Sequence, residues 1–307
     1  MGLTHAYGPA VPEKKAVKQI WDAYEAGYTY FDTAECYLGN YADGSPANNE
    51  SIIGKALKSV RDKVVIATKF GVTHGGDHLI LDSGPETIRK SVEGSLKRLG
   101  TDYIDLYYQH RIDPKVEPEQ VAEVMKELMK EGKVRYWGIS ETNETYLRRA
   151  DAVCKVTAIQ NRYSMMARWH ENLFPVCEEL NIGYVAFSPL ANGILSDAFK
   201  KGDSFAEGDF RNSMPQYSDQ GHEDSEELLT YLRELSGKKG ATPAQISLAW
   251  MLCKKDYIVP IPGTRKKDRM LENAGAADVV LTPEEVRIMD AHLNQIKIPA
   301  VFGGHSS

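Results

Sequence analysis

Short apolar segments and longer amphipathic segments alternate along this chain, and glycine marks four of the junctions between them. Amphipathic stretches end near Gly27, Gly100, Gly132 and Gly183, and a short apolar run follows each of them. Glycine readily adopts the left-handed backbone conformation that closes a helix, so the next strand can begin at once. Helices that alternate with strands in this way predict parallel strands joined by crossover helices.

These runs predict seven strands and eight helices. The strand segments lack a strict alternation of apolar and polar residues, which is typical of strands buried on both faces of a sheet. The expected strands span residues 28–31, 64–69, 103–109, 135–139, 158–160, 184–187 and 258–261. The expected helices span residues 13–26, 49–59, 86–99, 119–130, 171–180, 225–236, 244–254 and 283–293. The pattern predicts an α/β fold, a (β/α)8 TIM barrel that lacks its first strand.

That first strand would lie at or before Met1. We therefore expect either a shortened form of a longer chain or a barrel that closes imperfectly. No linker or low-complexity tract interrupts the chain, so residues 1–307 are expected to form a single domain. The segment from Gly193 to about Asp224 has no periodicity. Structureless loops longer than about 15 residues are uncommon in compact domains and often act as lids.

Charge and cysteine content narrow the classes of partner. With 37 basic and 43 acidic side chains the formal net charge is -6, which does not favour nucleic acid or an anionic membrane. An anionic ligand therefore needs a local cluster of cations. The four cysteines are far apart and form no CxxC pair, so neither a zinc site nor a disulfide framework is expected. The N-terminus lacks the apolar region of a secretory signal, and we expect a cytoplasmic protein without a membrane span.

Reactive side chains stand at the ends of six predicted strands. In a barrel of this type the carboxyl ends of the strands share one face, and active sites form on that face. The side chains that this arrangement would gather are Asp32, Lys69, His110, Ser140, Gln160 and Ser188. They come from different strands, so only the fold can bring them together.

Tyr37 follows the first of these strands and is the candidate proton donor. Tyrosine has a reference pKa of about 10, and a nearby ammonium such as that of Lys69 favours the phenolate and lowers this pKa. Asp32 would be the counter-ion of Lys69, and His110 would hydrogen-bond a substrate oxygen. Each residue also has a structural alternative: Asp32 as a turn cap, Lys69 reaching into solvent, and His110 as a packing residue.

A second candidate site lies near the C-terminus, in the sequence VPIPGTRKKDRMLENA. A strand runs into Pro262 and Gly263, and Thr264 would then cap a short helix rich in cations. These cations are Arg265, Lys266, Lys267 and Arg269. Helix N-termini and arginine side chains bind phosphate, and the last strand of a barrel is a frequent phosphate site. The alternative is a solvated basic helix face. A GxGxxG loop is absent, so no Rossmann site is predicted.

Six motifs, taken together and in this order, resemble the aldo-keto reductases. They are FDTAECY (31–37), ATKFG (67–71), YYQHRIDP (107–114), QNRYS (160–164), FSPLANGILS (187–196) and IPGTRKKDRMLENA (261–274). The similarity covers nearly the whole chain, and the combination is far more specific than any one motif. The HRIDP form is similar to the branch that includes the potassium-channel β-subunit and perakine reductase. The family's N-terminal β-hairpin and first strand have no counterpart here.

The resemblance implies a catalytic role for four residues. Tyr37 would protonate the carbonyl oxygen, while Lys69, paired with Asp32, would lower the pKa of Tyr37. His110 would orient the carbonyl, and hydride would come from carbon 4 of the nicotinamide of NADPH. Cys36, beside Tyr37, is interpreted as a small packing residue, with redox sensitivity as the alternative.

The resemblance also implies a set of cofactor-binding residues for NADPH (NADP+). At the nicotinamide, Ser140 and Gln160 would contact the carboxamide and Phe187 the ring. The pyrophosphate would be contacted by Ser188, Leu190, Asn192 and Gly193. The 2′-phosphate region would be contacted by Gly263, Thr264, Arg265, Lys266 and Arg269, and the adenine by Glu272 and Asn273. The chain departs from the family at three places. Glu141 stands where asparagine is frequent, Phe187 where tyrosine is frequent, and residues 209–217 only partly match an arginine-rich segment.

We therefore expect NADPH-dependent reduction of aldehydes, ketones or quinones, with a small-molecule carbonyl as partner and the oligomeric state left open. An NADPH-binding regulatory protein is the first alternative, since channel β-subunit relatives mainly serve a partner. A metal-dependent barrel hydrolase is the second. It would use Asp32, Glu35, His110 and Asp113, although no pair of histidines has metal-ligand spacing.

Overall fold

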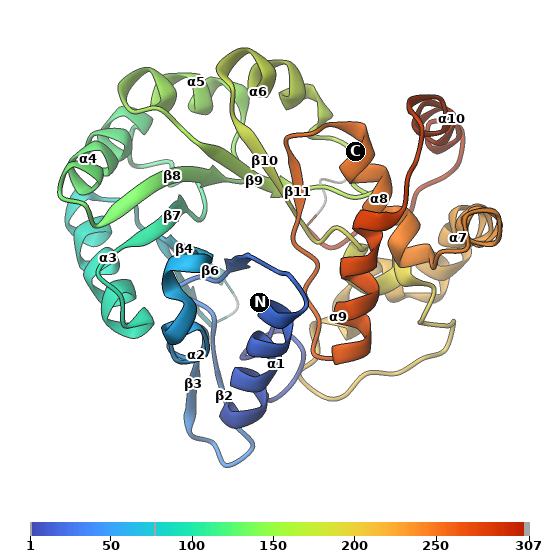
Figure 1. Ribbon diagram of the computed structural model, residues 1–307, viewed down its shortest axis with the longest axis horizontal. Helices are drawn as coiled ribbons and strands as arrows, with labels where there is room; N and C mark the ends of the chain where they lie inside the picture. Colours follow the sequence, from blue (N-terminus) through green and yellow to red (C-terminus); the bar gives the residue numbers. More distant parts are fainter. Residues whose placement is uncertain (1, 77, 304–307) are drawn as a thin grey trace. The chain divides into compact units, whose positions relative to one another are not determined.

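All seven predicted strands form, and they belong to one sheet with the order β1-β4-β7-β8-β9-β10-β11 (Figure 1). Their bounds are β1 (Tyr30–Asp32), β4 (Val65–Phe70), β7 (Ile104–Gln109), β8 (Val134–Ser140), β9 (Ala158–Arg162), β10 (Gly183–Phe187) and β11 (Ile258–Pro260). The pairings β1–β4, β4–β7, β7–β8 and β8–β9 are all parallel. The predicted α/β class, with the alternating helices and parallel strands of a (β/α)8 barrel, is confirmed.

The eight predicted helical segments also form. They correspond to α1 (Glu13–Glu25), α2 (Asn49–Leu57), α3 (Pro85–Leu99), α4 (Pro118–Lys130), α6 (Phe174–Leu180), α7 (Asp219–Lys239), α8 (Pro243–Lys254) and α10 (Pro283–Leu293). Proline occupies the first position of α3, α4, α8 and α10. The missing N–H of proline costs no intrahelical hydrogen bond there, so these starts are readable from sequence.

One helix was not predicted, and one starts earlier than predicted. α5 (Glu144–Val153) buries only Tyr146, Leu147 and Ala150, which is too short an apolar stripe to stand out. α7 begins at Asp219, directly after Ser218, whose side chain accepts the Gly221 N–H at 3.0 Å. The first turns of α7 are mostly polar, and their helical structure was therefore missed.

The segment predicted to be structureless is shorter than expected and contains single helical turns. Three 3-10 turns lie in or at its edge: η3 (Ala191–Ser196), η4 (Phe210–Ser213) and η5 (Pro215–Tyr217). Two hairpins outside the main sheet were also not predicted. They are β2 (Leu38–Asn40) with β3 (Pro46–Asn48), and β5 (Val72–Gly75) with β6 (His78–Leu81).

The computed structural model describes residues 2–76 and 78–303, and the chain forms two units. Unit 1 comprises Met1–His5, Pro9–Asn161 and Leu173–Tyr184, and unit 2 comprises Ala6–Gly8, Arg162–Asn172 and Val185–Ser307. The single domain over residues 1–307 stays a prediction. None of the helices in the described part of the chain is both long and apolar enough to cross a membrane.

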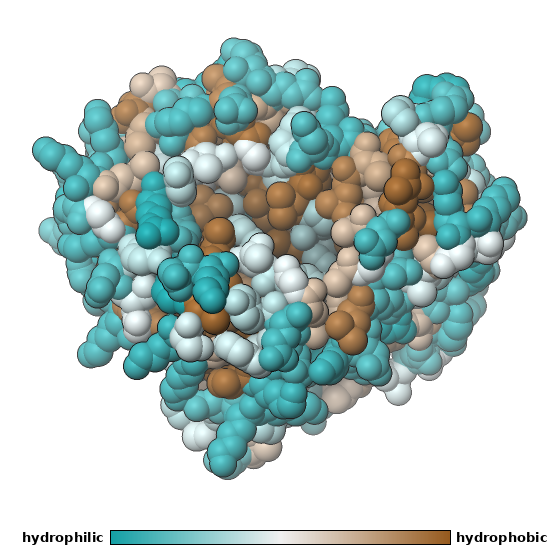
Figure 2. Space-filling view, in the orientation of Figure 1, coloured by the Kyte–Doolittle hydropathy of each residue, from teal (hydrophilic) through white to brown (hydrophobic). Residues whose placement is uncertain are grey.

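In unit 1 the helices cover the sheet with their apolar faces inward. α3, α4 and α5 lie along strands β4, β7 and β8 (Figure 1). Hydrophilic side chains cover the outer sides of α4 and α5 in Figure 2. The inner sides bury Ile88, Met125 and Leu147. In unit 2, Tyr163 stacks on Trp250 of α8 at 5.4 Å between ring centroids. Burying such large apolar surfaces is the main stabilising contribution in each unit.

Candidate active site

The polar side chains at the strand ends of unit 1 converge. Asp32 ends β1, Lys69 lies in β4, and His110 directly follows β7. The parallel register pairs Asp32 with Ala67 and Lys69 with Tyr108, so the carboxyl ends of these strands lie at the same edge. All three side chains are buried. Asp32, Lys69 and His110, which were predicted from their strand-end positions to lie together, therefore do so in the structure.

Lys69 makes the central contacts of this group. Its Nζ lies 2.6 Å from Asp32 Oδ1 and donates a second hydrogen bond to the Thr33 carbonyl at 2.7 Å. The third contact of Nζ is the hydroxyl of Tyr37 at 3.4 Å. Three oxygens thus surround an ammonium that is only 1% exposed. A buried charge requires such pairing, because an unpaired ion in the interior is very costly.

The pKa of Tyr37 does not follow the prediction. Burial raises the pKa of the Tyr37 phenol above its usual value, and the attraction of the Lys69 ammonium opposes that rise without cancelling it. Desolvation of the phenolate is the larger effect, whereas the predicted lowering rests on the ammonium alone. Burial also lowers the pKa of Lys69, but the attraction of Asp32 and Tyr37 outweighs it, so the pKa of Lys69 lies above its usual value. A neutral phenol therefore lies beside a charged ammonium.

His110 completes the group. Its ring meets the Tyr37 ring edge-on, with 5.8 Å between centroids. The Sγ atom of Cys36 lies 3.5 Å from His110 Nδ1. Burial lowers the pKa of His110 well below its usual value, and the nearby positive charge of Lys69 adds to this. The imidazole is therefore neutral at physiological pH. The ring of His5 also stacks on the Tyr37 ring, with 4.2 Å between centroids.

Two further predicted residues of unit 1 contact this group or lie at its edge. Gln160 donates from Nε2 to Asp32 Oδ2 at 2.8 Å, so one carboxylate joins the ammonium and the amide. Ser140 is buried at the end of β8, where Arg111 donates to its hydroxyl at 3.3 Å. The next residue, Glu141, has a positive φ of 53°. Left-handed backbone at a residue other than glycine is uncommon and often marks functional sites.

In unit 2 the predicted residues Ser188, Leu190, Asn192 and Gly193 form the turn that follows β10. Ser188, Asn192 and Gly193 all have positive φ, at 51°, 61° and 116°. Neighbours hold the turn in this shape: the Tyr217 hydroxyl donates to the Asn192 carbonyl at 2.8 Å. A Cβ added to Gly193 would lie 2.8 Å from the Phe199 ring, so glycine is required there. Successive N–H groups in such a turn can form an anion-binding concavity.

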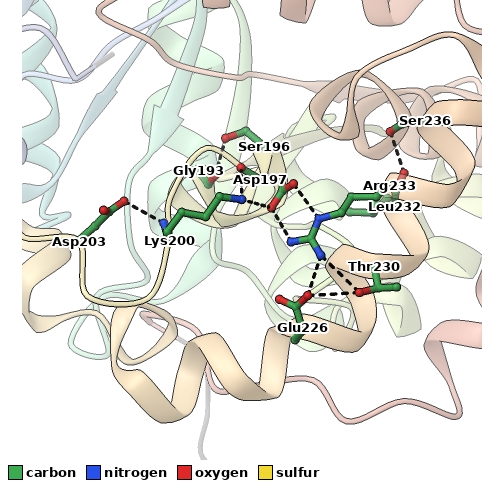
Figure 3. Close-up of polar contacts among 10 residues, drawn as sticks. All are labelled: Gly193, Ser196, Asp197, Lys200, Asp203, Glu226, Thr230, Leu232, Arg233 and Ser236. Carbon is green, nitrogen blue, oxygen red and sulfur yellow. Dashed lines mark hydrogen bonds and ion pairs between the residues drawn. The ribbon is translucent and has the colours of Figure 1, made fainter.

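This turn is anchored to α7 by an arginine (Figure 3). Arg233 of α7 donates from Nε and Nη2 to the two carboxylate oxygens of Asp197, each at 2.8 Å. Lys200 adds a contact to Asp197 at 3.1 Å, and Glu226 accepts from Arg233 at 2.6 Å. The hydrogen bonds from Arg233 hold the pKa of Asp197 below its usual value. Because Arg233 and Asp197 pair through two hydrogen bonds, the pairing fixes the orientation of the two side chains as well as their distance.

The basic segment near the C-terminus differs from the prediction in one respect. α9 (Lys267–Ala274) has Lys266 as its N-cap, so Thr264 does not cap the helix. Instead the Thr264 hydroxyl accepts the Lys266 N–H at 3.1 Å and closes a small turn after Gly263. Arg265 donates from Nη1 to the Tyr7 carbonyl at 2.8 Å, and burial lowers its pKa. The segment therefore presents a partly desolvated guanidinium before the first turn of a helix.

Two predicted adenine contacts lie on α9. Glu272 accepts from Arg269 Nη1 at 2.7 Å, so both side chains are already oriented. Asn273 is buried, and among the described residues its Oδ1 atom has no hydrogen-bond donor. A buried acceptor without a donor is rare in proteins and calls for a ligand or a water molecule. An amine would satisfy this acceptor, and the cations around the start of α9 suit a phosphate, so these residues are compatible with a nucleotide.

The segment predicted to be a lid is held by the chain's N-terminal turn. Asp209 forms an isolated antiparallel bridge with Tyr7, and the Phe210 N–H donates to the Ala6 carbonyl at 2.9 Å. Arg211 pairs with Asp209 at 2.6 Å, and its guanidinium lies over the Phe205 ring at 4.1 Å. This segment is therefore ordered by a charge pair and by aromatic contacts.

Comparison with known proteins shows the family to which the chain belongs. The model of the Aldo/keto reductase family matches residues 1–294. The chain belongs to the aldo/keto reductase family. Enzymes of this family are NADP-dependent oxidoreductases that reduce carbonyl groups, and this reductase is one of them.

Solved structures of similar proteins match the chain over most of its length. The reductase is similar to a glycerol dehydrogenase from Gluconobacter oxydans, with 25% identity, a TM-score of 0.85, and coverage of 98% of this chain and 92% of that one. An aldo-keto reductase from Bacillus halodurans in its holo form gives 27% identity, a TM-score of 0.74, and coverage of 97% and 92%. An aldo/keto reductase from Klebsiella pneumoniae in complex with NADP and acetate gives 27% identity, a TM-score of 0.69, and coverage of 93% and 88%.

Sequence reasoning missed several contacts of the reductase. The Thr33 carbonyl contributes through its backbone, which no side-chain pattern reveals. His5 and Tyr7 lie in an N-terminal segment that was read only for targeting signals. Cys36 was treated as packing, although its position beside Tyr37 was a signal that it lies near the reacting groups.

Proposed function

We propose that this reductase converts aldehydes, ketones or quinones to alcohols with NADPH, and that Tyr37 donates the proton. One observation carries the proposal: the phenol of Tyr37 lies 3.4 Å from a buried ammonium, which itself lies 2.6 Å from the carboxylate of Asp32. A neutral phenol beside a fixed positive charge suits an acid whose anion must be stabilised as it forms.

The protein's own residues would act on the carbonyl oxygen. Tyr37 keeps its proton at neutral pH, since a phenol has a pKa of about 10 and burial raises the pKa of Tyr37 further. When NADPH is bound, it supplies the hydride that reaches the carbonyl carbon. As negative charge develops on the oxygen, Tyr37 delivers its proton and Lys69 stabilises the phenolate left behind. Asp32 keeps Lys69 charged and in place, and neutral His110 donates a hydrogen bond that orients the carbonyl.

We propose the cofactor contacts that the family resemblance implies. In unit 1, Ser140 and Gln160 hold the carboxamide. The geometry supports this for Gln160, because its Nε2 is fixed by Asp32 and its Oε1 is thereby oriented. In unit 2, Phe187 stacks on the nicotinamide, and residues of the turn after β10 bind the pyrophosphate. The residues proposed for that turn and for the rest of the nucleotide are Ser188, Leu190, Asn192, Gly193, Gly263, Thr264, Arg265, Lys266, Arg269, Glu272 and Asn273.

The YYQHRIDP sequence at 107–114 supports a finer assignment to the branch that includes the channel β-subunit and perakine reductase. Part of that branch holds NADPH while serving a partner protein. The complete set of Asp32, Tyr37, Lys69 and His110 favours retained chemistry. Binding of NADPH without its oxidation, over a panel of carbonyl compounds, would favour the regulatory function instead.

The deciding experiment substitutes Tyr37. In Tyr37→Phe we expect turnover to fall by about 100-fold or more, in line with the loss of a general acid. The dissociation constant for NADPH should stay the same, because the ring and its packing remain. Tyr136→Phe changes an exposed tyrosine of the same unit and should leave both values as they are. Unchanged turnover in Tyr37→Phe would refute the mechanism.

A further inference from the structure

We propose that Cys36 is a positioning residue: its thiol donates a hydrogen bond to His110 Nδ1 and so keeps the imidazole proton on Nε2. This inference rests on the proposed function, in which His110 orients the substrate carbonyl. It assigns a task to a side chain that sequence reasoning treated as packing.

The contact is between buried atoms. Cys36 Sγ lies 3.5 Å from His110 Nδ1, which is within hydrogen-bonding range for sulfur. Cys36 is 5% exposed and His110 is 8% exposed. The thiol belongs to a small apolar cluster with Ala34 and Val72, against which Tyr37 and Leu81 pack. These apolar neighbours pack around the thiol, and among the described residues the side-chain hydrogen bond of Cys36 is the one with His110 Nδ1.

Both partners are electrically neutral. Burial raises the pKa of the Cys36 thiol to about 11, and the Lys69 ammonium opposes this only in part. The pKa of His110 is lowered, first by burial and then by the charges of Lys69 and Arg111, with His5 and His74 also facing it. At neutral pH the pair therefore consists of a protonated thiol and an uncharged imidazole, which carries its proton on one nitrogen only.

The chemistry of the two atoms decides which nitrogen that is. A neutral imidazole nitrogen without a proton is a good acceptor, and a thiol sulfur is a weak one. An S–H···Nδ1 bond is therefore better than the reverse Nδ1–H···S contact. The hydrogen bond made by one ring nitrogen sets the protonation of the other. Nε2 then carries the proton and can donate to a carbonyl oxygen, whereas the other tautomer would present a lone pair and repel that oxygen.

A redox role for Cys36 fits these observations less well. Oxidation and thiol exchange proceed through the thiolate, and a thiol in apolar surroundings with a raised pKa is inert. The same features that disfavour reactivity keep the proton on sulfur, which is the state that the positioning role requires.

The test measures the tautomer of the His110 imidazole directly. Protein labelled with 15N at the histidine rings shows distinct nitrogen shifts for the two neutral tautomers, and His110→Gln identifies the signals of His110. We compare the wild type, Cys36→Ala, Cys36→Ser and the control Cys177→Ala, which removes another buried thiol of the same unit. The measurement is made at neutral pH on the full chain, both free and with NADPH.

We expect His110 to carry its proton on Nε2 in the wild type, in Cys36→Ser and in Cys177→Ala. In Cys36→Ala the ratio of tautomers should shift toward Nδ1–H by roughly 2- to 10-fold, the effect of one net hydrogen bond on an equilibrium. The same variant should lose kcat/KM for carbonyl substrates by a similar factor without a change in NADPH affinity, and Cys36→Ser should restore it. An unchanged tautomer ratio in Cys36→Ala would overturn the proposal. Because this readout needs no turnover, it stands apart from failure of the Tyr37 mechanism.

Discussion

At the scale of single residues, Lys69 shows how one buried charge can organise a group of neighbours. Its ammonium contacts a carboxylate, a backbone carbonyl and a phenol, and each contact limits where the others can lie. Such a charge is tolerated only while Asp32 is ionised and near. Stability and chemistry are therefore coupled at this position.

The first prediction removes the ammonium. In Lys69→Met the carboxylate of Asp32 remains buried without its cation, and loss of one partner of a buried pair costs about 3–5 kcal/mol. Urea unfolding should show this loss, and NADPH oxidation should fall by at least about 100-fold. Lys55→Met removes one side of a surface pair with Glu13, 58% and 45% exposed, and should cost no more than about 1 kcal/mol. Equal losses in the two variants would contradict the burial argument.

The second prediction concerns His110 and pH. Its pKa in the folded protein lies well below the usual 6.5, so below that pH the unfolded chain binds a proton that the folded chain does not. Unfolding then takes up a proton, and stability falls as pH drops below about 6.5. In His110→Gln this part of the loss should vanish, up to about 1.4 kcal/mol per pH unit. Urea unfolding between pH 7.5 and 5.5 measures it, with His78→Gln as the control at an exposed histidine.

At the scale of elements, the junctions between helices and strands depend on backbone conformation. α3 ends at Gly100, which has φ of 65° and caps the helix by donating its N–H to the Leu96 carbonyl at 2.9 Å. The strand β7 begins a few residues later. Because the backbone at Gly100 is left-handed, glycine is favoured at this position even where there is room for a larger side chain.

The third prediction compares two glycines that both have open space at Cβ. Gly100→Ala forces a side chain into left-handed backbone and should cost about 1 kcal/mol or more. Gly237→Ala lies inside α7, where alanine is the better helix former, and should add about 0.5–1 kcal/mol. Chemical unfolding of both variants provides the comparison. Similar effects at the two sites would mean that φ is not what selects glycine at Gly100.

At the scale of the whole molecule, the net charge of -6 works against an anionic cofactor. Local cations must overcome it, and four of them lie around the start of α9, between Arg265 and Arg269. Arg265 is oriented there by a backbone acceptor, the Tyr7 carbonyl. A planar guanidinium suits the oxygens of a phosphate.

The fourth prediction follows from that placement. NADPH at about 100 times its dissociation constant should stabilise the folded protein by about 2.7 kcal/mol, and a thermal melt should register the shift. NADH at the same concentration should give a smaller shift, because it lacks the 2′-phosphate. Arg265→Met should reduce the NADPH shift and leave the NADH shift nearly unchanged. An equal reduction for both cofactors would place Arg265 away from the 2′-phosphate.

The sequence by itself determined the strands of the main sheet and most of the helices. Apolar periodicity, helix-ending glycines and helix-opening prolines are local signals, and all seven predicted strands of the sheet form. The glycine signal is wrong at Gly183, because Asn181, with φ of 52°, closes α6 and Gly183 begins β10. α5 was not predicted because its apolar stripe is short, and the start of α7 was not predicted because its first residues are mostly polar. The positions of Asp32, Lys69 and His110 at strand ends also predicted that they lie close together, since the carboxyl ends of parallel strands share an edge.

Only the tertiary structure decided how these groups are charged and held. Desolvation depends on neighbours that are distant in sequence, so the raised pKa of Tyr37 could not be read from its spacing to Lys69. The contact of Cys36 with His110 joins residues from two different strand ends, and its 3.5 Å distance depends on how the segments pack. Local sequence patterns determine backbone conformation because they act between neighbouring residues. The burial and hydrogen bonding of the side chains at the active site depend on residues that only the whole fold brings together.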